Sequence, residues 1–86
     1  MLEALITSKT RLKLLTKFFL NVGTKAYLQE LANEFGESSN GIRMELNHLT
    51  KAKLLFTERK GRTVLYQANP HHGLFSTIQE ALQKNV

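Results

Sequence analysis

The side chains best suited to chemistry in this sequence are basic and amide groups, gathered in two short segments. The first segment holds Ser39, Asn40, Arg43, Met44 and Asn47, and the second holds Arg59, Lys60 and Arg62 around one glycine. Arg and Lys bind phosphate, and Arg and Asn can also form paired hydrogen bonds with the edges of guanine and adenine. These residue types therefore favour recognition of a nucleic acid over bond-breaking chemistry.

Residues that catalysis or a metal site would need are missing from the sequence. There is no cysteine, no aspartate, no glycine-rich phosphate loop and no nucleophile motif. Of the three histidines, His48 stands far along the chain from the adjacent pair His71 and His72. We therefore expect no enzyme, no metal site and no cofactor. The lack of cysteine also favours a reducing, cytoplasmic setting.

The charge of the chain is positive and unevenly distributed. Twelve Lys and Arg stand against seven acidic residues, which gives +5 at pH 7. Residues 51–62 carry five bases and one acid, and residues 9–17 carry four bases and no acid. Residues 26–45, in contrast, carry four glutamates and one arginine. A small basic chain suggests a polyanionic partner, and no apolar stretch is long enough to span a membrane.

The 86 residues fit one domain over 1–86, and hydrophobic periodicity divides it into four helices and a hairpin. We expect helices over Lys9–Leu20, over Lys25–Phe35, from Ser38 or Ser39 to about Lys51, and over Leu74–Lys84. Strands are expected over Leu54–Glu58 and Thr63–Ala68, with a turn over Arg59–Arg62. Ser8, Thr24 and either Ser38 or Ser39 are the expected N-caps, and Gly36 is an expected C-cap. The first helix has a broader apolar stripe than a small core needs.

The third helix carries the candidate binding face. Ile42, Leu46 and Leu49 follow the i, i+4, i+7 spacing of a buried stripe. The opposite face then presents Ser39, Asn40, Arg43, Met44 and Asn47. A helix that ends a tight helix-turn-helix can enter the major groove, and a hairpin with a basic tip can reach the flanking phosphates. The predicted fold is thus α+β and mainly α: a winged helix-turn-helix with a three-helix core, a β-hairpin wing and a C-terminal helix.

Several segments resemble ArsR-type winged-helix regulators. Residues 28–36 (LQELANEFG) resemble the first helix of the motif, residues 38–49 the recognition helix, residues 52–55 the segment after it, and residues 59–66 the wing. The tail from Tyr66 to Ile78 is closer to small stand-alone winged helices and to domains that precede nucleotidyltransferases. Three departures matter: Lys53 replaces the usual glycine after the recognition helix, Glu45 stands where a polar or basic residue is common, and the Cys-rich metal motif is absent.

Each candidate residue has a second interpretation. Arg43 is the best candidate for a base contact, because Arg can pair with O6 and N7 of guanine; the alternative is a solvated residue paired with Glu45 or Asn47. Asn40 either pairs with adenine or caps the helix, and Ser39 either binds a phosphate near the helix start or caps the helix. Asn47 is expected at the DNA backbone rather than at a base. Lys51 and Lys53 either face the DNA backbone or are ordinary surface charges. The wing cations Arg59, Lys60 and Arg62 fit phosphate or minor-groove contacts, or simply a solvated turn. The bases of residues 9–17 are expected on a solvated helix face outside the site.

Together these features predict sequence-specific binding of double-stranded DNA by a transcriptional regulator, most simply a repressor. It would act as a homodimer through its first and last helices, with recognition helices roughly 34 Å apart. The alternative is a winged-helix protein-interaction module that uses the acidic segment 26–45. RNA binding is a third hypothesis, and it is disfavoured because the chain lacks an aromatic platform on which unpaired bases could stack.

Overall fold

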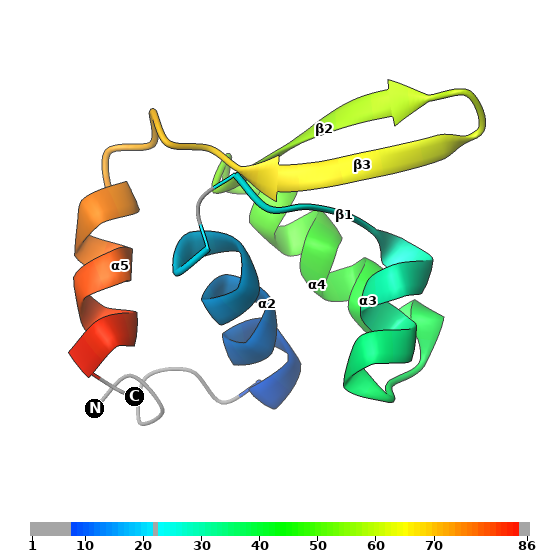
Figure 1. The fold of residues 1–86 in the computed structure, drawn as a ribbon, viewed down its shortest axis with the longest axis horizontal. Helices are drawn as coiled ribbons and strands as arrows, with labels where there is room; N and C mark the ends of the chain where they lie inside the picture. The colour runs from blue at the N-terminus through cyan, green and yellow to red at the C-terminus, as the bar shows by residue number, and fades with distance from the viewer. Residues whose placement is uncertain (1–7, 22, 85–86) are drawn as a thin grey trace.

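The computed structural model describes residues 8–21 and 23–84. Along the chain they form α2 (Lys9–Phe19), β1 (Lys25–Tyr27), α3 (Leu28–Phe35), α4 (Ser39–Lys51), β2 (Leu55–Lys60), β3 (Thr63–Ala68) and α5 (Phe75–Lys84). The strands form one antiparallel sheet in the order β1-β3-β2. In Figure 1 the helices lie on one side of the sheet, and the β2–β3 hairpin projects beyond them as a wing. The predicted winged helix-turn-helix is therefore confirmed.

Helix α2 is the central helix of the core. Ser8 caps it as predicted, because its hydroxyl oxygen accepts a hydrogen bond from the Arg11 N–H at 3.1 Å. The wide apolar stripe is used within this chain: four of its residues, Leu14, Leu15, Phe18 and Phe19, are buried in the core. The breadth of this stripe therefore gives no separate argument for a dimer surface on α2.

The prediction of one long second helix over Lys25–Phe35, capped by Thr24, is wrong in its first part. Residues Lys25–Tyr27 instead form strand β1, with Lys25 opposite Gln67 and Ala26 opposite Tyr66 on β3. Pairing with β3 overrides the local helical pattern because it buries Ala26 in the core and satisfies its backbone. The helix α3 then begins at Leu28, and the Glu30 carboxylate accepts from the Tyr27 N–H at 2.9 Å.

The turn between α3 and α4 forms as the sequence predicts. Gly36 ends α3 in the left-handed conformation, with φ of 63°. Ser38, rather than Ser39, caps α4, and its hydroxyl accepts from the Gly41 N–H at 3.1 Å. The stripe of Ile42, Leu46 and Leu49 is buried as predicted, so the opposite face of α4 is directed outward.

After α4 the chain reverses at Lys53, which has a φ of 65° and is the residue that replaces a glycine in the resembling family. The Leu54 N–H donates to the Leu49 carbonyl at 3.0 Å, and the Lys53 N–H donates to the Thr50 carbonyl at 3.0 Å. This is the helix ending that usually places glycine in the left-handed position. The Asn69 amide donates to the Lys53 carbonyl at 2.9 Å and holds the reversal against the end of β3.

The wing hairpin is longer than predicted. Strand β2 runs to Lys60, so Arg59 and Lys60 belong to the strand and not to the turn. Lys60 pairs with Thr63, which leaves Gly61 and Arg62 as a two-residue turn. Gly61 has a φ of 62°, as such a hairpin turn requires at its first position. Every residue from Leu55 to Lys60 pairs with a residue of β3, so the strand continues through Arg59 and Lys60.

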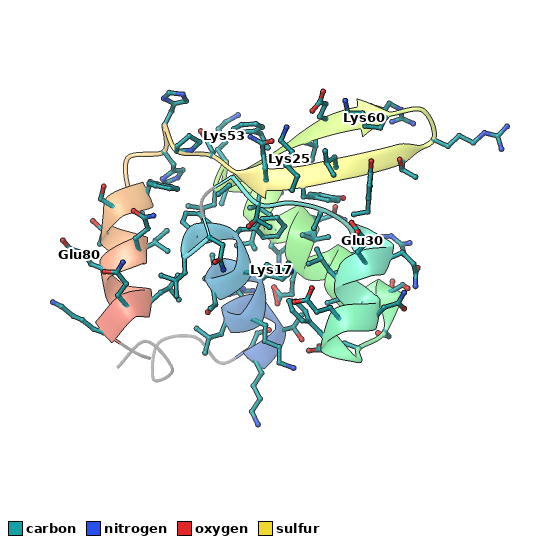
Figure 2. The ribbon with its side chains drawn as sticks, viewed as in Figure 1. Lys17, Lys25, Glu30, Lys53, Lys60 and Glu80 are labelled. Carbon is teal, nitrogen blue, oxygen red and sulfur yellow. The ribbon has the colours of Figure 1, made fainter. Side chains whose placement is uncertain are left out.

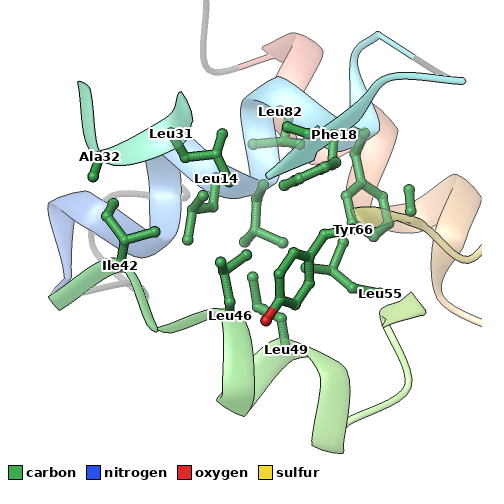
Figure 3. Packing of buried hydrophobic residues seen from close by; sticks show 14 residues of the cluster. Leu14, Phe18, Leu31, Ala32, Ile42, Leu46, Leu49, Leu55, Tyr66 and Leu82 are labelled. Carbon is green, nitrogen blue, oxygen red and sulfur yellow. The ribbon is translucent and has the colours of Figure 1, made fainter. Parts of the chain in front are cut away.

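Helix α5 closes the other side of the core against α2. Leu82 is buried, the rings of Phe75 and Phe19 lie 5.3 Å apart, and the Gln79 amide donates to the Phe19 carbonyl at 2.9 Å. Figure 3 shows the core, in which Leu82, Phe18 and Leu14 meet side chains of the helix-turn-helix and the sheet. One continuous core therefore holds α3, α4 and the base of the wing in fixed positions.

Candidate nucleic-acid interface

The outward face of α4 is an exposed polar stripe. It consists of Asn40, Arg43, Met44, Asn47 and Lys51, all exposed, at the i, i+3, i+4, i+7 and i+11 positions of one helix face. Met44 has 54% of its surface exposed, in a fold with few exposed large apolar side chains. Across residues 8–21 and 23–84, no side-chain hydrogen bond or ion pair of the stripe is found, so its polar groups are available to a partner.

Ser39 differs from the rest of the predicted face. Its side chain is half-buried, and its hydroxyl donates to the Gln29 carbonyl oxygen of α3 at 3.2 Å. Ser39 therefore links the two helices of the motif, and it lies at the margin of the exposed stripe.

Glu45 is directed away from the exposed stripe and toward α2. Its carboxylate accepts from the Ser8 hydroxyl at 3.0 Å and from Arg11 Nε at 3.0 Å, and the side chain is 12% exposed. His48 Nδ1 lies 3.5 Å from the same carboxylate. Burial by itself would raise the pKa of Glu45, but the hydrogen bonds from Arg11 and Ser8 outweigh it and lower the pKa. The acid that would repel phosphate on the binding face is thus held inside the helix-turn-helix scaffold.

The other glutamates of the acidic segment are also engaged. Lys13 pairs with Glu37 at 3.0 Å, and Lys17 pairs with Glu34 at 2.7 Å. The Thr10 hydroxyl also donates to Glu37, and the hydrogen bonds from Thr10 and Lys13 lower the pKa of Glu37. Three of the four glutamates of residues 26–45 thus pair with bases of α2, whereas Glu30 is exposed and bonded to the Tyr27 N–H.

The wing cations divide between the two faces of the hairpin. Side chains alternate along a strand, so Arg59 shares the face of buried Leu55, whereas Lys60 lies on the opposite face. Figure 2 shows Lys60 on the side of the hairpin away from the helices. Lys60 also lies 3.2 Å from Glu58 in an ion pair between half-exposed side chains, which contributes little. Arg59 is better placed than Lys60 to act together with α4.

A groove of about 410 Å³ lies between the wing, α3 and the outward face of α4. Its walls include Arg43 of α4, Arg62 of the wing turn and Gln29 at the start of α3, over an apolar floor with Val64 and Tyr66. The structure thus brings together two predicted residues from different elements and adds Gln29, which the sequence reasoning missed. No local signal could have found Gln29, because its proximity to Arg43 depends on how the two helices and the wing pack.

The remaining predicted residues lie outside this groove. Lys51 ends the exposed stripe of α4, and Lys53 stands at the reversal beyond it, with both side chains exposed. In the described part of the chain no three His, Cys, Asp or Glu side chains gather into a possible metal site. No helix within that part is both long and apolar enough to cross a membrane.

Comparisons with known proteins identify the fold. No family model matches the sequence, and no curated protein is significantly similar to it. Among solved structures, reduced HlyU from Vibrio cholerae has a TM-score of 0.73 and 20% identity, over 98% of this chain and 83% of that one. AF1382 from Archaeoglobus fulgidus has a TM-score of 0.68 and 17% identity, over 99% and 89%.

A third similar structure is described as a possible transcriptional regulator for arsenical resistance. It has a TM-score of 0.59 and 25% identity, over 96% of this chain and 77% of that one. The fold of this chain is therefore that of an ArsR-like winged helix, which confirms the resemblance inferred from residues 28–66.

Proposed function

We propose that this protein binds double-stranded DNA in a sequence-specific manner and acts as a transcriptional repressor in the cytoplasm. One observation carries the proposal. The exposed stripe of α4 and the wing present cations that have few internal partners, whereas the glutamates of residues 34–45 are paired with α2. The positive charge therefore stands on the two elements that can reach a duplex. The similarity to a structure described as a possible transcriptional regulator for arsenical resistance supports this function at the level of fold.

The proposed docking places α4 in the major groove and the wing along the flanking backbone. Asn40 near the start of α4 can pair with adenine, and exposed Met44 can contact the methyl group of thymine. Asn47 and Lys51, one and two turns farther along, fit contacts with phosphates of the same strand. Arg59 and Arg62 of the wing extend the contact to the neighbouring backbone.

We further propose a homodimer through the helices at the two ends of the chain, with the whole chain as one winged-helix domain. Helix α5 supports this geometry more directly than α2 does. Leu74, just before α5, is 54% exposed, and Ile78 and Ala81 of α5 are half-buried, at the i, i+4 and i+7 positions of one face; Ile78 also packs against the core. Two-fold symmetry would then present two recognition helices to successive major grooves. We expect Leu74→Glu to yield monomers in sedimentation experiments.

The function is tested by titrating purified protein into a duplex from its own upstream region and into an unrelated duplex, at low and near-physiological salt. Preferential binding to the upstream duplex, lost in Asn40→Ala, supports a sequence-specific regulator. Asn21→Ala, at an exposed asparagine beyond the end of α2, is the matched control and should bind as the wild type does. Binding of both duplexes with equal affinity would contradict sequence-specific autoregulation, and binding of neither at low salt would refute DNA binding.

A further inference from the structure

The groove between the wing and the helix-turn-helix has polar walls of one charge sign. Arg43 and Arg62 approach it from α4 and from the turn of the wing, and neither forms an ion pair within residues 8–21 and 23–84. The glutamates nearest to them along the chain are engaged elsewhere: Glu45 with Arg11, and Glu58 with Lys60. The residues that line the groove include two arginines and no acidic residue, and the nearby Glu30 carboxylate accepts from the Tyr27 N–H at 2.9 Å. This lining favours an anionic occupant.

A third donor stands beside the arginines. The Gln29 amide carbonyl accepts from Ser39, which fixes the side chain, while one of the two amide N–H groups is directed to Asn33 at 3.4 Å. The other N–H has no hydrogen-bond partner among the described residues, and Gln29 is one of the residues that line the groove. The Thr63 hydroxyl donates to the Lys60 carbonyl at 2.8 Å, so it is not counted among the donors available to a ligand. Two arginine forks and one amide donor suit the oxygens of a phosphate group.

The position of the groove decides which anion it can meet. Base edges lie inside the major groove, whereas a DNA strand passes between a helix in the groove and a wing beside it. Arg43 is the residue of the exposed stripe that lines the groove beside the wing. Resting on the DNA binding proposed above, we infer that Arg43 and Arg62 hold one and the same backbone phosphate, assisted by Gln29. Arg43 then fixes the register of the helix on DNA, and base recognition belongs to Asn40 and Met44.

This assignment is tested by a double-mutant cycle on a duplex of arbitrary sequence at low salt, because a phosphate contact does not depend on sequence. We expect Arg43→Ala and Arg62→Ala each to weaken binding about tenfold. The double variant should be weakened by well under the hundredfold product, because the two side chains share one partner. The slope of log K against log salt should fall by about 0.9 in the double variant, against about 1.8 for two separate phosphates.

Lys60→Ala is the matched control, since it removes a wing cation that is not among the residues lining the groove. The fold-loss of affinity in the Lys60→Ala, Arg43→Ala double variant should equal the product of the two single losses. The ratio of affinities for the upstream and unrelated duplexes should stay unchanged in Arg43→Ala. If the losses of affinity of Arg43→Ala and Arg62→Ala multiply in the double variant, or if that ratio changes, the shared phosphate site is overturned while DNA binding stands. Failure of the wild type to bind any duplex would overturn both proposals.

Discussion

Removing the carboxylate of Glu45 should destabilise the fold without improving DNA binding. The side chain is 12% exposed and accepts hydrogen bonds from Ser8 and Arg11, at 3.0 Å each, which join the start of α2 to the middle of α4. A hydrogen bond to a charged group contributes about 1.5 to 3 kcal/mol, but Arg11 can be rehydrated because 38% of its side chain is exposed. We therefore expect Glu45→Ala to lower the free energy of unfolding by about 2 kcal/mol in total.

For a domain of this size, that loss corresponds to a fall in Tm of about 8 to 16 °C. Thermal and urea unfolding at pH 7, followed by circular dichroism, measure it directly. Glu80→Ala is the control, because Glu80 is an exposed acid on α5 and should unfold as the wild type does. If Glu45→Ala left stability unchanged and tightened DNA binding, Glu45 would face the duplex, and the orientation described above would be refuted.

Two further predictions follow from the same contacts and from the reversal after α4. The pKa values of Glu45 and Glu37 lie below their ordinary value of 4.5, so their contribution to stability is complete above that pH and is lost as the pH falls through the lowered values. Urea unfolding between pH 7 and pH 3 should show this decline, and Glu45→Gln should flatten it. Lys53→Gly should raise the free energy of unfolding by about 0.5 to 1 kcal/mol, because Lys53 has a φ of 65° and glycine adopts this conformation without steric cost. Unchanged or lower stability of Lys53→Gly in urea would show that the Lys53 side chain makes a compensating contact.

Local patterns were sufficient for most helices and for the existence of the hairpin. Ser8, Gly36 and Ser38 end or begin helices through hydrogen bonds to residues within one turn, so their signals are complete in the sequence. The buried stripe of α4 likewise follows from helical spacing alone. Once that stripe is assigned, the exposed stripe from Asn40 to Lys51 follows by geometry.

The errors came from contacts between segments far apart in the chain. Strand β1 forms because Lys25–Tyr27 pair with β3, about forty residues later, and the three residues carry no strand signal strong enough to reveal this. The extension of β2 through Arg59 and Lys60 also depends on pairing with β3. That extension places the two cations on opposite faces, which a turn would not do.

The sequence by itself determined the fold class, the recognition helix and the residues that it exposes, because caps and hydrophobic periods act over a few residues. Only the tertiary structure decided how the charges are used. It pairs the acidic segment with the bases of α2, turns Glu45 away from the exposed stripe, and brings Arg43, Arg62 and Gln29 to one groove. These outcomes depend on which helix faces meet when the common core is buried, and that information is distributed over the whole chain.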